Sequence, residues 1–422
     1  MELVIHRGTD EIGASCVEVR GAGRRIFLDA GLPLDDAVDA PACLPSRLPG
    51  GLSGADALFI SHSHLDHCGL LDQVPENIPV YMSETARQLV DTSRMFNRKP
   101  LLNRPILPLT LGNEVRLGEI VVTPRLMDHS APDALGFHVQ ADGQGIFYTG
   151  DFRSHGRKGK AFEHLLQHPP KPLGALLMEG TLLDRSNVTY PDETSVEKAM
   201  AKAFRDEPGL SCVVCSGQNI DRLVSVYRAT RKAGRDLVLD LYTAWVLEVF
   251  GRTHASTPRM EWDGVRVLAH GRWASRHYGV ISNAPDFFGD FRQRVYAPGV
   301  AIRPEKLTAR PGNFVVKTSR PFALVEEFKS ASVTTVYSLW AGNLDPTRRR
   351  REAEEYAALE ARPGSHLLHI HTSGHADLET LRRLNEALRP KVLIPMHTEH
   401  KHKFPTHFPN ALVLEDGQVH TL

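Results

Sequence analysis

The 422-residue sequence has little cysteine, no excess of charge of either sign and no long apolar run, and each absence excludes a class of protein. The five cysteines are an odd number spread thinly along the chain, which excludes a disulfide-stapled secreted scaffold and indicates a reducing compartment. No apolar run approaches the roughly 20 residues of a membrane helix, and residues 1–7 do not resemble a signal peptide. We therefore expect a cytoplasmic protein that does not interact with membranes.

Charge balance limits what the whole surface can bind. The 50 Lys and Arg residues equal the 50 Asp and Glu residues, so a polyanion would have to be held by local basic patches. The length favours two to three domains with cores large enough to fold without disulfides. Composition thus permits nucleic-acid binding but does not indicate it.

The cysteines themselves predict no zinc site. They are Cys16, Cys43, Cys68, Cys212 and Cys215. The last two form a CxxC pair inside the apolar run 210–216, and no second pair completes a tetrahedral zinc site. We predict buried core thiols there.

The chain shows two different secondary-structure patterns. The first third predicts short strands over residues 16–19, 25–28, 57–60, 119–123 and 146–148. From about residue 175 strands and helices alternate, which is typical of a parallel α/β sheet. Helices are predicted to begin at a capping box over 194–197, near Asp221, near Ala244 and after Asp377. Strands are predicted over 210–216, 236–242, 366–371 and 392–394. Residues 252–320 show no clear pattern, and residues 411–422 predict a closing hairpin.

The strongest chemical signal is the segment 59–69, where an apolar strand runs out into His62, His64, Asp66 and His67. Four ligand-type side chains at the end of one strand can surround a pair of cations, and imidazoles suit zinc or similar metals. A polar surface loop that happens to be rich in histidine is the alternative, and the density of ligand types disfavours it.

The HxHxDH pattern resembles the hallmark of the metallo-β-lactamase superfamily. The family's remaining ligands have matches in order along this chain: His129 after Met127-Asp128, Asp151 after Thr149-Gly150, and His397 after Met396. The resemblance implies that His62, His64 and His129 hold one divalent metal, that Asp66, His67 and His397 hold a second, and that Asp151 bridges them. Zinc is the expected metal and manganese the alternative. Asp29 could orient a ligand imidazole or could be an ordinary turn residue.

A second resemblance covers most of the chain. Glu179, His375 and His397 resemble motifs A, B and C of the β-CASP group, the nucleic-acid-processing branch that includes ribonuclease J. The implied fold is α/β, a four-layer αββα metallo-β-lactamase fold with an inserted β-CASP α/β domain. The implied boundaries are 1–181 and 363–422 for the metallo-β-lactamase domain and 182–362 for the insertion.

This group implies roles for particular residues. Histidine at motif C accompanies RNA-acting members, so His397 indicates single-stranded RNA as substrate, with DNA as the alternative. The expected catalytic residues are Asp66, Asp151, Glu179 and His375, and His375 is the candidate proton donor to the departing oxygen. The expected substrate-binding residues are Ser373, Gly374, Arg153 and Lys401.

The sequence also departs from ribonuclease J. Only 25 residues follow His397, so we expect the family's extra C-terminal domain, and assembly through it, to be absent; homo-oligomer formation stays open. Residues 315–321 replace a Gly/Ser-rich segment that helps to bind a 5′ end, so the choice between endonucleolytic and 5′ exonucleolytic cleavage stays open. Three alternatives remain: a DNA nuclease, a hydrolase of small esters or cyclic phosphodiesters, and a non-catalytic RNA-binding subunit.

Overall fold

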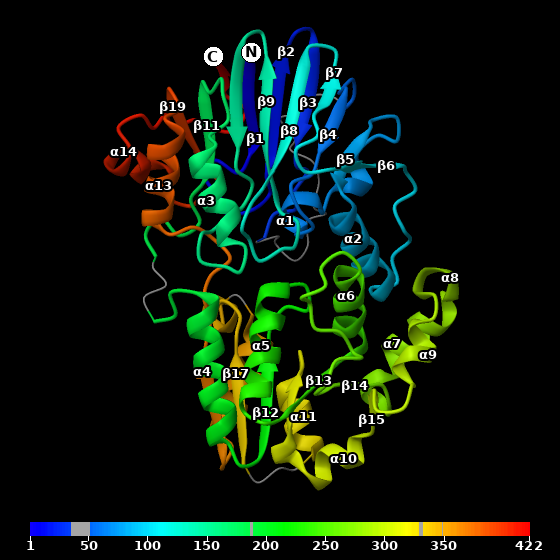
Figure 1. Cartoon of the computed structure of the whole chain (residues 1–422). Coiled ribbons are helices and arrows are strands. Elements are labelled where there is room, and N and C mark those ends of the chain that lie inside the picture. The colour runs from blue at the N-terminus through cyan, green and yellow to red at the C-terminus, as the bar shows by residue number, and fades with distance from the viewer. Residues whose placement is uncertain (35–50, 186–188, 329–331, 348) are drawn as a thin grey trace. The chain divides into compact units, whose positions relative to one another are not determined.

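The computed structural model describes residues 1–34, 51–185, 189–328, 332–347 and 349–422, so Cys43 lies outside the described residues. The chain forms two compact units (Figure 1). Unit 1 comprises Met1–Asp91, Pro100–Ser186 and Gly374–Leu422, and unit 2 comprises Thr92–Lys99 and Asn187–Ser373. Unit 1 is therefore assembled from segments far apart in the sequence.

Unit 1 contains two mixed sheets. In spatial order the first sheet is β20 (Val419–Thr421), β1 (Glu2–Arg7), β2 (Cys16–Gly21), β3 (Arg24–Leu28), β4 (Ala57–Phe59), β5 (Val80–Ser83) and β6 (Ile106–Leu109). The second sheet is β19 (Val392–Met396), β11 (Ala175–Glu179), β10 (Gln144–Tyr148), β9 (Leu135–Ala141), β8 (Ile120–Leu126) and β7 (Val115–Leu117). β3 to β6 are parallel neighbours in the first sheet, as are β10, β11 and β19 in the second. The carboxyl ends of these strands carry most of the candidate ligands.

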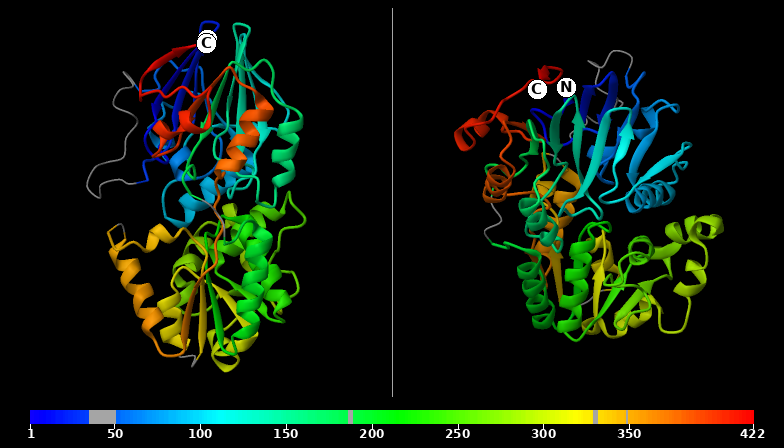
Figure 2. Two further views of the ribbon diagram at one scale, coloured as in Figure 1. Left: turned by 90° about the vertical axis from the view of Figure 1, so that its left-hand side faces the viewer. Right: turned by 45° about the horizontal axis from the view of Figure 1, so that its top comes forward.

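Three apolar clusters separate four layers. Alternate residues of the two sheets, such as Val17 and Val19 of β2 and Phe137 and Val139 of β9, fill a core between the sheets. A second cluster covers the outer face of the second sheet with α3 (Gly159–Gln167), α13 (Leu378–Leu388) and α14 (Phe404–His407). Figure 2 shows α3 and α13 side by side on that face. A third cluster lies on the outer face of the first sheet, next to α1 (Leu65–Cys68) and α2 (Glu84–Phe96). This is the predicted αββα arrangement, so the fold class is confirmed.

Unit 2 is built on one fully parallel sheet. Its order is β15 (Ala301–Ile302), β14 (Val265–Leu268), β13 (Asp236–Leu239), β16 (Phe314–Lys317), β12 (Leu210–Val214), β17 (Val333–Tyr337) and β18 (Ser365–His369). Its helices are α4 (Glu193–Asp206), α5 (Ile220–Lys232), α6 (Leu241–Gly251), α7 (Arg272–Asn283), α8 (Pro285–Phe288), α9 (Phe291–Val295), α10 (Pro304–Ala309), α11 (Pro321–Phe328) and α12 (Arg350–Ala361). β12 and β17 are buried along their whole length, as expected where helices cover both faces.

Four sequence predictions differ from the structure. α4 begins two residues earlier than expected, because the side chain of Asp192 accepts the Ser195 backbone N–H and forms the capping box with Ser195. Residues 252–320 contain α7 to α10 and β14 to β16, whose short lengths and many interruptions hide their periodicity. The closing hairpin was wrong: β20 pairs with β1, and Ala411 instead bridges Leu393 in parallel. The strand predicted over 366–371 is β18 and ends at His369.

The four described cysteines are buried, and none forms a disulfide within the described residues, as predicted for core thiols. Cys212 lies in β12, where burial raises the pKa of its thiol to about 12. In the described part of the chain, no helix combines the length and the apolar character needed to span a bilayer.

Candidate metal centre

The histidine-rich loop follows the fully buried strand β4 and turns directly into the one-turn helix α1. Three backbone hydrogen bonds hold it: Ser15 N donates to Asp66 O at 3.1 Å, Ala30 N to His67 O at 2.9 Å, and Leu32 N to Leu65 O at 2.9 Å. A Cβ at position 31 would lie 1.8 Å from Asp66 O, so this close approach requires Gly31. The loop is therefore rigidly positioned by the segment after β3.

The first ligand group contains His62, His64, His129 and Asp151, whose ligand atoms all lie within 4.8 Å of one another. The Nε2 atoms of His62 and His129 each lie 3.8 Å from Asp151 Oδ2. Nδ1 of His64 lies 3.2 Å from His129 Nε2. Three imidazole nitrogens and one carboxylate oxygen thus face a common point.

The second ligand group contains Asp66, His67, His397 and again Asp151, also within 4.8 Å. His67 Nε2 lies 3.2 Å from Asp151 Oδ1, and His397 Nε2 lies 3.6 Å from the same oxygen. His397 Nε2 is also 3.3 Å from Asp66 Oδ2. Asp151 therefore turns one carboxylate oxygen toward each group.

The ligand atoms themselves indicate a metal. Both carboxylate oxygens of Asp151, and Nε2 of His62 and of His67, are buried and have no hydrogen-bond partner among the described residues. Burying a carboxylate without a partner lowers the stability of the folded state by roughly several kcal/mol unless a cation offsets the cost. Imidazole and carboxylate are the ligand types that zinc accepts, so the residues present fit divalent metals.

Four of the five proposed imidazole ligands have an orienting partner on the opposite nitrogen. His67 Nδ1 donates to Asp29 Oδ2 at 2.7 Å, and His129 Nδ1 donates to the Gly374 carbonyl at 2.7 Å. Nδ1 of His62 contacts Ser61 Oγ at 3.0 Å, and Nδ1 of His397 contacts Thr181 Oγ1 at 2.9 Å. Such contacts fix each ring and leave Nε2 as the ligand atom.

The pKa values of the ligand side chains depend on burial and on the charges of Asp29 and Asp151. Burial lowers the pKa of His62 and of His129 well below the ordinary value, assisted by the neighbouring imidazoles. Burial would also lower the pKa of His67, but Asp151 and Asp29 outweigh it and raise that pKa. For Asp151, burial alone would raise the carboxyl pKa; His397, His67 and His375 reverse the effect and lower it.

A third cluster adjoins the second group. Nδ1 of His375 lies 3.0 and 3.1 Å from the two carboxylate oxygens of Glu179 and 3.8 Å from Asp151 Oδ2. Glu179 is buried at the end of β11 and also accepts the backbone N–H groups of Phe152 and Thr181. Burial lowers the pKa of His375, but Glu179 and Asp151 outweigh it and raise the pKa to about 9. His375 can therefore hold a proton at neutral pH.

The four predicted substrate-binding residues differ in burial and in the unit to which they belong. Gly374 lies in unit 1 and orients His129 through its carbonyl, whereas Ser373 is assigned to unit 2. Arg153 is fully buried, with Nε 3.5 Å from Asp128 Oδ1, and Lys401 is buried and donates to Glu415 and to the Leu414 carbonyl. Neither cation is accessible to a nucleic-acid backbone, so the prediction for Arg153 and Lys401 was wrong.

Sequence reasoning missed three orienting residues. Tyr148 OH donates to Asp29 Oδ2 at 2.6 Å, and Ser61 Oγ donates to the same oxygen at 2.8 Å. Thr181 reaches His397 across 216 positions of sequence. Ser61 precedes the ligand His62 and Thr181 lies two positions after Glu179, which is the one signal that could have singled them out.

Known proteins resemble this chain in sequence and in fold. The family model described as "Beta-lactamase superfamily domain" matches residues 24–205. Ribonuclease J of Sinorhizobium meliloti is 26% identical over 192 residues, which cover 43% of this chain and 33% of that protein. Ribonuclease J 1 of Streptococcus pyogenes is 23% identical over 420 residues, which cover 93% of this chain and 68% of that protein.

A solved structure of a protein of unknown function from Enterococcus faecalis V583 has the same fold. The TM-score is 0.78 at 20% sequence identity, and the match covers 100% of this chain and 99% of that one. Among the first ribonuclease J relatives, this chain spans only 33% to 42% of their length. Their complete activity is therefore not carried over by similarity alone.

Proposed function

We propose that this chain, which is similar in fold and sequence to metallo-β-lactamase-type proteins and to ribonuclease J enzymes, is a metal-dependent hydrolase that cleaves RNA phosphodiester bonds. One observation carries the proposal: Asp151 offers to each of two ligand groups one buried carboxylate oxygen that has no hydrogen-bond partner among the described residues. A single carboxylate in that position suits a pair of cations. Among the described residues, no hydrogen bond compensates for the burial of the Asp151 carboxylate.

The two groups define which residues would hold which ion. His62, His64 and His129 would hold one, Asp66, His67 and His397 the other, and Asp151 both. When bound, two divalent metals supply an activated water near neutral pH and neutralise charge on the phosphate. Zinc is our proposal for the native metal because imidazole ligands predominate, with manganese second.

His375 and Glu179 would manage the proton on the departing oxygen. Glu179 lies within hydrogen-bond distance of His375 Nδ1 and favours the protonated ring, and the His375 side chain is 20% exposed, so a substrate can reach it. We propose that His375 donates a proton to the departing oxygen as the phosphodiester bond breaks and regains a proton from solvent, while the Glu179 carboxylate favours the protonated ring. Asp66 and Asp151 act by holding metals.

RNA is the proposed partner because the relatives named above are ribonucleases and because His397 resembles the motif C histidine of RNA-acting members of the β-CASP group. We propose single-stranded RNA, since the chemistry needs an accessible phosphodiester. DNA is the nearest rival. The chain's own segment at 315–321 leaves the choice between internal cleavage and cleavage from a 5′ end to experiment.

The test is cleavage of end-labelled RNA by purified protein supplied with zinc or manganese. Matched RNA strands with a 5′-phosphate or a 5′-hydroxyl, and a DNA strand of the same sequence, separate direction and substrate. We expect RNA cleavage by the wild type and by His164→Ala, an exposed histidine of α3. Asp151→Ala and His64→Ala should be inactive, and unchanged turnover in either variant would refute the proposal.

A further inference from the structure

The segment that leads to His375 begins in unit 2, where one buried cation holds it. β18 ends at His369, and residues 370–373 follow it without helix or strand. Arg222, in the first turn of α5, is fully buried, and its guanidinium contacts this segment. The contacts of Arg222 therefore bear on how the chain arrives at His375.

Each N–H group of the Arg222 guanidinium faces an acceptor. Nε donates to one carboxylate oxygen of Glu193 at 3.2 Å, and Nη2 donates to the other at 3.0 Å. Nη2 also donates to the Thr372 carbonyl at 2.9 Å. Nη1 donates to the Ser338 carbonyl at 3.0 Å and lies 3.2 Å from His371 Nδ1. A guanidinium has five donors in one plane, so this set of acceptors engages all of them.

The acceptors around the guanidinium are themselves held in place. Burial and the neighbouring guanidinium charge lower the pKa of His371 to about 3, so its ring is neutral and its Nδ1 can accept a hydrogen bond. Ser338 Oγ donates to the Ile370 carbonyl at 2.5 Å, which is a second hold on the segment. Ser225 Oγ donates to Glu193 Oε2 at 2.7 Å and fixes that carboxylate. The network thus defines the backbone positions of residues 370–372.

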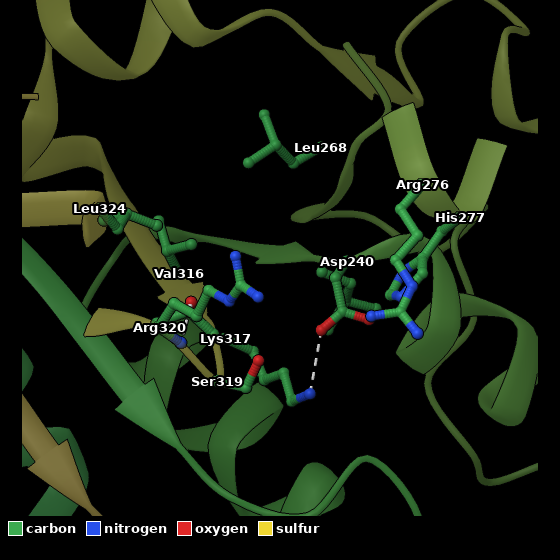
Figure 3. Close-up of a pocket in the computed structure, with 11 residues that line it drawn as sticks. Asp240, Leu268, Arg276, His277, Val316, Lys317, Ser319, Arg320 and Leu324 are labelled. Carbon is green, nitrogen blue, oxygen red and sulfur yellow. Dashed lines mark hydrogen bonds and ion pairs between the residues drawn. The ribbon is translucent and has the colours of Figure 1, made fainter. Parts of the chain in front are cut away.

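Arg222 differs from the basic residues that border open space in unit 2. Lys317 pairs with Asp240 at 2.9 Å beside a cavity of about 210 Å³, which Arg276 and Arg320 also line (Figure 3). Arg222, in contrast, is 0% exposed and directs its donors at protein atoms. It cannot contact a substrate, so any effect of Arg222 on catalysis has to act through the segment that it holds.

The residues that follow Thr372 serve the candidate metal centre. The Gly374 carbonyl accepts His129 Nδ1–H at 2.7 Å, and His375 Nδ1 lies 3.0 Å from a carboxylate oxygen of Glu179. A Cβ at position 374 would lie 3.3 Å from Cε1 of His129, so the backbone packs closely against that ring. A misplacement of about 1 Å by a change remote from the chemistry can lower an enzymatic rate by about 10²-fold.

We propose that Arg222 is a positioning residue for RNA cleavage: through the Thr372 carbonyl it fixes the backbone that presents His375. The inference rests on the proposed function, in which His375 is the proton donor. Arg222→Lys keeps a positive charge beside Glu193, but an ammonium offers its three donors from a single nitrogen and cannot reach the carboxylate and both carbonyl groups together. This variant therefore separates the position of the donors from the charge.

The experiment compares full-length Arg222→Lys with the matched control Ser225→Ala, whose missing hydroxyl donates to the same Glu193 carboxylate. Cleavage of end-labelled RNA by zinc- or manganese-loaded protein gives kcat and KM. Hydrogen–deuterium exchange of the metal-free proteins reports on the amides of residues 370–376 and needs no activity. Both measurements are made well below the thermal midpoint of each variant. If Arg222→Lys does not fold, Ser338→Ala takes its place, because it removes another hydrogen bond to the segment.

We expect kcat of Arg222→Lys to fall by about 10- to 100-fold with KM little changed, and residues 370–376 to exchange faster than in wild type. Ser225→Ala should keep the kcat and the exchange rates of wild type. Wild-type kcat or wild-type exchange in the test variant overturns the proposal, and so does an equal fall of kcat in Ser225→Ala. If the wild type does not cleave RNA but the test variant still exchanges faster over 370–376, the proposed function fails while the anchoring by Arg222 stands.

Discussion

Asp29 Oδ2 accepts the Nδ1–H of His67 at 2.7 Å, while Nε2 of the same ring is buried without a hydrogen-bond partner among the described residues. The carboxylate thereby fixes both the tautomer and the direction of a proposed metal ligand. Asp29 adopts a positive φ of 62° at the end of β3, a backbone conformation that non-glycine residues rarely adopt. Its carboxylate also binds Ser61 and Tyr148, so one side chain ties together three elements of the site.

Replacing Asp29 by asparagine tests this relationship. Asp29→Asn keeps the size of the side chain but removes the charge that favours the metal-binding tautomer of His67. We expect zinc affinity to fall by about 10- to 100-fold, measured against a competing chelator. Tyr148→Phe is the control, because it removes a contact to Asp29 without touching an imidazole, and it should have a smaller effect. Equal affinity of Asp29→Asn and wild type would contradict the orienting role.

His375 should affect turnover more than metal content. His375→Ala removes the proposed proton donor but none of the seven proposed ligands, so kcat on RNA should fall by about 10²- to 10⁴-fold while zinc content is retained. Glu179→Gln should lower kcat in the same direction, because His375 loses the carboxylate that raises its pKa. Loss of zinc from His375→Ala would show instead that the residue is a ligand, as its cluster with Glu179 and His397 permits.

Arg222 is predicted to stabilise the segment that follows β18 and leads to His375. It is fully buried, forms an ion pair with Glu193 at 3.0 Å and donates to the Thr372 carbonyl at 2.9 Å, three residues before His375. Arg222→Met should lower the free energy of unfolding by about 3–5 kcal/mol, because it leaves Glu193 buried without its charge partner.

Two further variants make the Arg222 prediction specific. Arg228→Met, on the exposed face of the same helix, should change denaturant stability by less than about 0.5 kcal/mol. Adding Glu193→Gln to Arg222→Met should recover part of the loss. If Arg222→Met is as stable as wild type in chemical denaturation, the buried network is not structurally important.

Glu18 predicts a pH dependence of stability. Burial alone would raise its carboxyl pKa, but hydrogen bonds with His6, Arg20 and Arg25 hold the pKa below the ordinary value of 4.5. A carboxyl whose pKa is depressed by folding stabilises the protein above its unfolded pKa, and this contribution declines as pH falls toward the folded value. The thermal midpoint of Glu18→Gln should therefore lie furthest below that of wild type near about pH 7, and the gap should narrow below about pH 5. The exposed control Glu114→Gln should show a small gap that changes little with pH. A gap that widens on acidification would contradict this sign.

The sequence predicted the parts of this structure that depend on local patterns. The strands of the first third, the helix capped by Asp377 and the loop with His62 and Asp66 all rest on short-range periodicity and turn chemistry. The alternation after residue 175 predicted the parallel sheet of unit 2. These features need no knowledge of which distant segments meet.

The missed features depend on distant contacts. Thr181 meets His397 because β11 and β19 are neighbours in the second sheet, and Tyr148 meets Asp29 because β10 and β3, from different sheets, end near one another. Arg153 and Lys401 follow motif residues, which suggested exposure, but each is buried against acidic or carbonyl oxygens that no local pattern reveals. β20 pairs with β1 at the far end of the chain, an association that outcompetes the local hairpin.

Elemental analysis of metal content, after dialysis against zinc-free buffer, tests whether Asp151 and its neighbours hold two ions. We expect about two zinc ions per wild-type chain and per His164→Ala chain, and fewer in Asp151→Ala, because both proposed ions share that carboxylate. A wild-type protein that cannot be loaded with zinc or manganese, or an Asp151→Ala protein that retains both ions, would contradict this expectation.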